Sequence, residues 1–239
     1  MGNGYGSEFH LLRFMGRHRH YLDDLVLNLV RAKSIDWIDF PFDKSTPSKD
    51  AEWKGISFLK ANSRLERAWE DFWPTGRGIH NWDAIAKLDF GSSSEEWLLV
   101  EAKANLEEIK SSCGARDGLA KIKTAFADVK SALGVVSDRD WLSPYYQYCN
   151  RVAALHFLNA NGVRSHLLFI YFCGDLWKRS GAQPTCPKTE SDWQPALRDQ
   201  AQHVGLPPRH PLAERIHSLY PPVCVSSDPK ETSKLSVTR

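Results

Sequence analysis

The chain has 239 residues, of which 42% are hydrophobic and 25% charged, and its formal net charge is +2. This length suits one generous domain, and the composition is that of a globular protein with ample material for a core. No apolar run reaches roughly 18 residues and no secretory pattern opens the chain, so we expect neither a membrane span nor a signal peptide. Because the net charge is near neutral, binding to nucleic acid requires a local basic groove, which 31 lysines and arginines can supply.

The cysteines give no sign of a metal site or a disulfide framework. They are odd in number, widely spaced and without a CxxC pair, at Cys113, Cys149, Cys173, Cys186 and Cys224. Zinc ribbons and disulfide frameworks use paired cysteines at short, regular spacings. We therefore expect reduced thiols and a cytoplasmic protein.

The first 60 residues predict an N-terminal arm, one helix and a loop. Residues 1–19 are glycine-rich and then basic, which is typical of an arm. Leucine and valine recur at helical spacing over residues 21–31, with two aspartates in the first turn, so we expect a helix there. Residues 34–60 contain two prolines and a polar stretch, which predicts a long irregular connection.

Residues 61–175 have the most regular patterns and predict the core. An apolar stripe over residues 63–72 indicates a helix. Two strands are expected at residues 81–90 and 96–104. The Gly91-Ser92-Ser93-Ser94 segment between them has a length that suits an antiparallel hairpin.

Two helices and a strand complete this core. Apolar residues recur every three or four positions over residues 117–133, where Asp117 can cap the start. Residues 143–160 predict a second helix with Ser143 as its cap. The short run at residues 166–173 is apolar on both faces, as in a buried central strand. The order helix, strand, strand, helix, helix, strand predicts an α/β fold whose mixed central sheet is flanked by helices.

Residues 176–226 are polar and punctuated by prolines, and we expect an extension that packs on the core. Its patterns predict helices near residues 194–204 and 212–220 and a short strand at residues 223–225. Residues 227–239 predict a disordered tail.

The strand expected at residues 96–104 carries the most informative side chains. After the apolar run Trp97-Leu98-Leu99-Val100 it places Glu101 and Lys103 two residues apart, so the two side chains share one face. Charges at the end of a buried strand are costly to desolvate without partners. A simple ion pair between the two is one interpretation, but it gives Asp83 no role.

Asp83 lies near the start of the preceding strand, which a hairpin brings beside the end of the next one. If paired residue numbers sum to 184 or 186, Asp83 faces Glu101 or Lys103, and all three share a face. A slip of one residue sends Asp83 to the opposite face.

Two carboxylates and a lysine at one point suit a hydrolytic metal site. Carboxylate oxygens hold Mg²⁺ or Mn²⁺, and phosphate and water complete the shell. The metal polarises the phosphate and lowers the pKa of a bound water, while a lysine orients that water or neutralises developing charge.

Asp83, 17 intervening residues and Glu101-Ala102-Lys103 resemble the PD-(D/E)XK motif of restriction-endonuclease-like nucleases. The resemblance covers roughly residues 63–173 and implies a restriction-endonuclease-like core. It implies a metal-dependent nuclease acting on nucleic acid, DNA rather than RNA, with the backbone carbonyl of Ala102 as a further metal ligand. Trp82 stands where the motif has proline. Many such nucleases cut as dimers, although no dimer interface is visible in the sequence.

The same resemblance implies an acidic residue on the helix before the hairpin. Glu66 and Glu70 are the candidates, one turn apart, and Glu66 is preferred. Each also has an ordinary structural interpretation. Ser63 and Glu66 are spaced as a capping box, and Glu70 suits a solvated helix face.

Four further residues are candidates for contacts with substrate phosphate. Gln147 and Arg151 lie four apart on the helix expected over residues 143–160, where a solvent-exposed face is the alternative. Arg77 and His80 flank the turn before the first hairpin strand.

Two other functions remain open from the sequence. One is a nuclease fold that has lost activity and binds nucleic acid or protein, which predicts binding without metal. The other is a structural or protein-interaction domain, which predicts no salt-dependent binding to nucleic acid.

Overall fold

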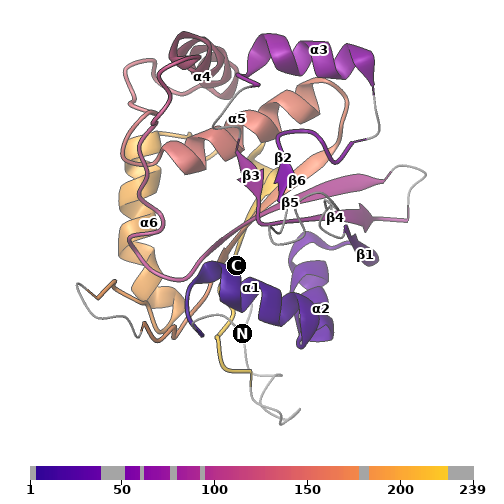
Figure 1. Cartoon of the computed structure of the whole chain (residues 1–239), viewed down its shortest axis with the longest axis vertical. Coiled ribbons are helices and arrows are strands. Elements are labelled where there is room, and N and C mark those ends of the chain that lie inside the picture. The colour runs from indigo at the N-terminus through magenta and orange to yellow at the C-terminus, as the bar shows by residue number, and fades with distance from the viewer. Residues whose placement is uncertain are drawn as a thin grey trace, which may run out of the picture.

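The computed structural model describes residues 4–38, 52–59, 62–75, 80–91, 95–177 and 183–225. Its centre is a five-stranded sheet in the order β1-β4-β5-β6-β7 (Figure 1). The strands are β1 Ser34–Trp37, β4 Ala84–Asp89, β5 Glu96–Lys103, β6 Ser165–Tyr171 and β7 Ile216–Leu219. β4 is antiparallel to β1 and to β5, whereas β6 is parallel to β5 and to β7. The predicted α/β class with a mixed central sheet is therefore confirmed.

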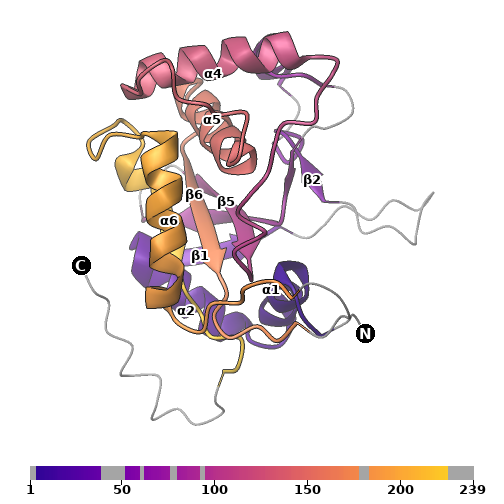
Figure 2. The ribbon, with the colours of Figure 1, turned by 90° about the vertical axis from the view of Figure 1, so that its left-hand side faces the viewer.

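Helices cover both faces of this sheet, as Figures 1 and 2 show. They are α1 Ser7–Gly16, α2 Arg19–Val30, α3 Ser63–Phe72, α4 Leu119–Leu133, α5 Tyr146–Ala160 and α6 Glu190–Val204, with a 3₁₀ turn, η1, at Ala213–Arg215. α1 and α2 share one core cluster with Leu98 and Val100 of β5. The other helices share a second cluster with Leu99. Because successive strand residues point to opposite faces, Glu101 and Lys103 lie on the α5 side.

α5 is the central helix of its layer. Seven apolar residues from Cys149 to Leu158 are buried, on every side of the helix, as expected for a helix enclosed between a sheet and other helices. Asn150 and Arg151 are buried with them. The polar side chains of its first turns must therefore find partners inside the protein.

A two-stranded sheet stands beside the main one. It pairs β2 Trp53–Lys54 with β3 Asn81–Trp82 in antiparallel register. Asp83 is the single residue between β3 and β4, and its backbone amide donates to the carbonyl of Val100 at 3.2 Å. Asp83 thus occupies the point where the chain leaves one sheet and enters the other.

Three expectations for strands and helices were wrong near the edges of the fold. The basic arm contains helix α1, because His10, Leu11 and Phe14 form a buried stripe at helical spacing. The expected irregular connection begins with strand β1, while residues 39–51 and 60–61 lie outside the described residues. The helix expected over residues 212–220 is η1 followed by β7, which gains a parallel ladder with β6 in place of helical hydrogen bonds.

Helix starts also differ from the prediction. α3 is capped by Asn62, whose side-chain oxygen accepts from the amides of Arg64 and Leu65, so Ser63 and Glu66 do not form the expected capping box. α5 begins at Tyr146, after a cis peptide bond at Ser143-Pro144, and Ser143 is not its cap.

Smaller differences concern the starts of two more helices and one short strand. α4 begins after Gly118 in place of Asp117, and α6 begins at Glu190, four residues before the predicted start. In place of the expected strand at residues 223–225, a single bridge joins Cys173 to Pro222. The tail at residues 227–239 lies outside the described part of the chain. Within that part, no helix is long and apolar enough to cross a membrane.

Candidate active site

The hairpin brings Asp83 beside the end of β5, next to Glu101. Ala84 pairs with Val100 and Ile85 with Leu99, so paired residue numbers sum to 184, one of the two sums for which the sequence predicted Asp83 near Glu101 and Lys103. The Ala102 amide donates to Asp83 Oδ2 at 2.7 Å. At this end of the ladder, the Asp83 side chain is thus the acceptor in place of a backbone carbonyl. The register therefore holds the first acid of the D…ExK pattern against the strand that carries the other two residues.

Glu101 is buried between two cations. Its side chain is 1% exposed, Oε1 accepts from Lys103 Nζ at 2.5 Å, and Oε2 accepts from Arg151 Nε at 2.7 Å. Burial is the largest influence and favours the neutral acid. The charges and hydrogen bonds of Arg151 and Lys103 together outweigh it and hold the pKa of Glu101 below its ordinary value. Glu101 is therefore ionised, with both oxygens already bonded.

The pKa of Asp83 is shifted in the opposite direction to that of Glu101. Burial and then the negative charge of Glu101 raise its pKa to about 7, against the smaller opposing effects of Lys103, the Ala102 amide and Arg151. The cations of the cluster are engaged by Glu101 and leave Asp83 poorly compensated. At neutral pH its carboxyl group is therefore divided between the charged and the neutral form.

α5 supplies the partners of both strand residues. Gln147 Oε1 accepts from Lys103 Nζ at 2.8 Å, and the backbone N–H of Gln147 donates to Ser111 Oγ at 2.8 Å. One turn later, Arg151 donates from Nη2 to the carbonyl of Asn81 at 2.6 Å, and its guanidinium lies 5.0 Å from the centre of a Trp82 ring. Gln147 and Arg151, the pair predicted to contact substrate, therefore reach the site. There their side chains are engaged by Lys103, Glu101 and the Asn81 carbonyl.

A cavity of about 450 Å³ opens over Asp83. It is lined by Glu52, His80, Asn81, Asp83, Ser111, Tyr146, Gln147, Asn150 and Arg151. Glu101 and Lys103 do not line this cavity and are almost fully buried. Of the three residues of the D…ExK pattern, a substrate in this cavity would therefore meet Asp83.

His80 lies in the wall of this cavity and is held by tryptophans. Its ring makes edge contacts with Trp82 at 5.0 Å and Trp69 at 5.6 Å between centroids, and neither ring nitrogen has a hydrogen-bond partner among the described residues. Burial and then the charge of Arg151 lower its pKa well below the ordinary value. The imidazole is therefore neutral. Arg77, its predicted companion, lies outside the described residues.

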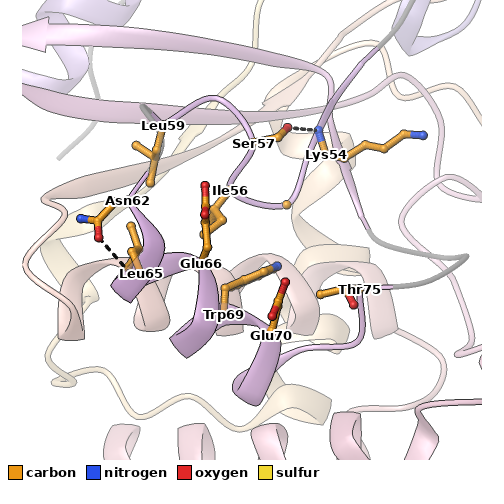
Figure 3. Close-up of a pocket in the computed structure, with 11 residues that line it drawn as sticks. Lys54, Ile56, Ser57, Leu59, Asn62, Leu65, Glu66, Trp69, Glu70 and Thr75 are labelled. Carbon is orange, nitrogen blue, oxygen red and sulfur yellow. Dashed lines mark hydrogen bonds between the residues drawn. The ribbon is translucent and has the colours of Figure 1, made fainter.

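Glu66 and Glu70 do not line the cavity over Asp83. They line a different cavity, of about 460 Å³, on the exposed side of α3, together with Lys54 and Trp69 (Figure 3). Figure 3 shows both carboxylates on α3, facing the segment that follows β2. The acid that shares a cavity with Asp83 is Glu52, which no sequence pattern pointed to, because β2 has only two residues.

The oxygen atoms around Asp83 suit a hard divalent cation. The Ala102 amide points to Asp83, and backbone groups of one strand residue share a direction, so the Ala102 carbonyl lies on the same side. Mg²⁺ and Mn²⁺ need few protein ligands, because phosphate and water fill the remaining positions. No three His, Cys, Asp or Glu side chains gather into a metal-binding group in the described part of the chain. The fit therefore rests on Asp83 and Ala102, with Glu101 behind them.

Searches with this sequence and structure found no matching protein-family model, curated protein or solved structure. What the site can do therefore rests on its own geometry.

Proposed function

We propose that this chain is a Mg²⁺- or Mn²⁺-dependent phosphodiesterase with a restriction-endonuclease-like core that hydrolyses nucleic acid, DNA rather than RNA. One observation carries the proposal. The hairpin sets Asp83 beside the end of β5, where its amide bonds to Val100 and its side chain to the Ala102 amide, while Glu101 and Lys103 share one face of that strand. This is the spatial arrangement that the D…ExK spacing predicts. The free state of all five cysteines fits the reducing, cytoplasmic setting that we also propose.

Each residue has a part that follows from its contacts. Asp83 and the Ala102 carbonyl would hold the cation, which supplies polarisation of the phosphate and a water of lowered pKa. Lys103 shares the face of Glu101, with its ammonium group fixed by Glu101 and Gln147. A lysine held in this way can orient the attacking water and stabilise negative charge that develops on the phosphate.

A second candidate function is metal-independent binding of nucleic acid by an inactive nuclease fold. The observation in its favour is the state of Glu101, whose two oxygens are each bonded to a cation. In the cluster of Asp83, Glu101, Lys103 and Arg151, two negative and two positive groups balance. This function predicts DNA binding that is unchanged by chelation of divalent metals and by Asp83→Asn.

Cleavage assays separate the two functions. Supercoiled and linear DNA and a matched RNA are incubated with the protein in Mg²⁺, in Mn²⁺ and in EDTA. We expect metal-dependent cleavage that is abolished in Asp83→Asn and in Lys103→Ala, and preserved in Lys121→Ala, whose exposed lysine donates to the Glu70 carbonyl away from the site. Circular dichroism confirms that the variants are folded. Cleavage at the wild-type rate in both site variants would refute the proposed function.

A further inference from the structure

Glu52 directly precedes β2 and Asp83 directly follows β3, so the two residues lie at the same end of a two-stranded ladder. β2 and β3 pair Trp53 with Trp82 and Lys54 with Asn81, so paired residue numbers sum to 135. The bond from the Gly55 amide to the His80 carbonyl, at 3.0 Å, continues the same register at the far end. One step beyond the near end, Glu52 and Asp83 would form the next pair, because 52 and 83 also sum to 135.

This pair would belong to the close type of antiparallel ladder. The Asp83 amide donates to Val100 on the β5 side, so it does not bond to Glu52. Residues that face each other without exchanging backbone hydrogen bonds have Cα atoms about 4.5 Å apart, with side chains on one face. Glu52 and Asp83 line the same cavity, as this pairing requires.

Asp83 therefore stands between two acids, Glu52 on the β2 side and Glu101 on the β5 side. Like charges directly opposite in a ladder are unfavourable without compensation. Arg151 and Lys103 form their ion pairs with Glu101. On the other side, Glu52 Oε2 accepts from the neutral amide Nδ2 of Asn81 at 2.5 Å.

The cavity carries a second sign that a ligand completes it. His80 is 7% exposed, and neither of its ring nitrogens has a partner among the described residues. The Oδ1 atom of Asn81, the residue that holds Glu52, is also buried without a partner in that part of the chain. Buried polar groups are nearly always paired. Two neighbouring residues with unpaired polar atoms in one cavity wall therefore indicate a site that binds a ligand.

We infer that Glu52, and not Glu66 or Glu70, is the further acidic ligand of the divalent-cation site, at the same end of the β2–β3 ladder as Asp83. The inference rests on the proposed function. Release of the Glu52 carboxylate from Asn81 would free it for a cation in the cavity that Asp83 also lines. Glu66 and Glu70 line the other cavity, on α3.

The test is calorimetric titration of Mn²⁺, without nucleic acid, into the wild type, Glu52→Gln, Asp83→Asn and the control Glu66→Gln. The titrations are made near pH 8, where Asp83 is ionised. Glutamine is isosteric and can still accept from Asn81, so the fold should be kept, and thermal melts check it. We expect Mn²⁺ affinity to fall about tenfold or more in Glu52→Gln, because ligand charge sets affinity, and to be unchanged in Glu66→Gln.

The outcomes separate the inference from the proposed function. Equal affinity in Glu52→Gln and the wild type, with loss in Asp83→Asn, overturns the role of Glu52 and leaves the proposed function standing. A loss in Glu66→Gln that matches Glu52→Gln overturns the choice between the two acids. Absence of Mn²⁺ binding by the wild type also overturns the inference, because a site with this many acids should bind the ion alone, whereas metal-dependent cleavage tests the proposed function separately.

Discussion

Replacing Arg151 by methionine should destabilise the protein strongly. Arg151 and Glu101 are 3% and 1% exposed, and the substitution removes the guanidinium from Glu101 Oε2 and from the Asn81 carbonyl. Breaking a buried ion pair by removing one partner costs about 3–5 kcal/mol, because the other charge stays buried. Lys103 still compensates Glu101 in the variant, so we expect the lower end, about 3 kcal/mol.

Urea denaturation followed by tryptophan fluorescence measures this loss in the free energy of unfolding. Arg164→Met is the matched control, because the Arg164 side chain is 57% exposed and lies 3.5 Å from Glu96, and we expect a change within about 0.5 kcal/mol. A loss below about 1 kcal/mol in Arg151→Met would show that Glu101 is not held as a buried charge.

The pH dependence gives a second check on the same charge. In the wild type the folded pKa of Glu101 is lowered, so its contribution to stability is present above the unfolded pKa and is lost as the pH falls through the folded value. Without Arg151, the buried Glu101 carboxylate is less compensated. Its charge therefore destabilises the folded protein more as the pH rises and Glu101 ionises. The stability difference between wild type and Arg151→Met should therefore shrink below about pH 4. A difference that stays constant down to acid pH would contradict the assigned cause.

Two further predictions concern the cap of α3 and the charge of Asp83. Asn62→Ala should lower the free energy of unfolding in urea by about 1 kcal/mol, because Asn62 accepts from the first-turn amides, and Ser63→Ala should leave it almost unchanged. Equal losses in the two variants would show that Ser63 also caps the helix. The folded pKa of Asp83 is raised to about 7, so its contribution is present below the unfolded pKa and is lost as the pH rises through about 7. Between about pH 5 and about pH 8 the melting temperature of the metal-free wild type should therefore fall more than that of Asp83→Asn; parallel melting curves would contradict the raised pKa.

The sequence was sufficient for the features that depend on long or regular patterns. The alternation in β5 placed Glu101 and Lys103 on one face, and the loop after β4 predicted the hairpin, while its exact register stayed open between pairings that bring Asp83 to these residues and a slip that does not. The periodicity of α4 predicted its place and length within two residues. These patterns succeed because each reports burial along a continuous element.

The features that the sequence left out depend on pairing between distant residues. β7 has four residues and β2 only two, too few for a period, and each exists because another strand offers it a ladder. Glu52 was missed for this reason. Arg151 was identified as a polar residue near the site, but its burial follows from the depth of α5 between sheet and helices, which helical spacing does not encode.

The place of β7 in the sheet has a consequence during synthesis. β6 is buried along its whole length, and the ladder with β7 covers its outer edge only once residues 216–219 have left the ribosome. Until then a nascent chain of more than 170 residues presents an apolar, unpaired strand edge, the kind of surface that draws other chains into aggregates. The time needed to translate residues 172–219 thus sets how long this edge of the sheet stays unpaired.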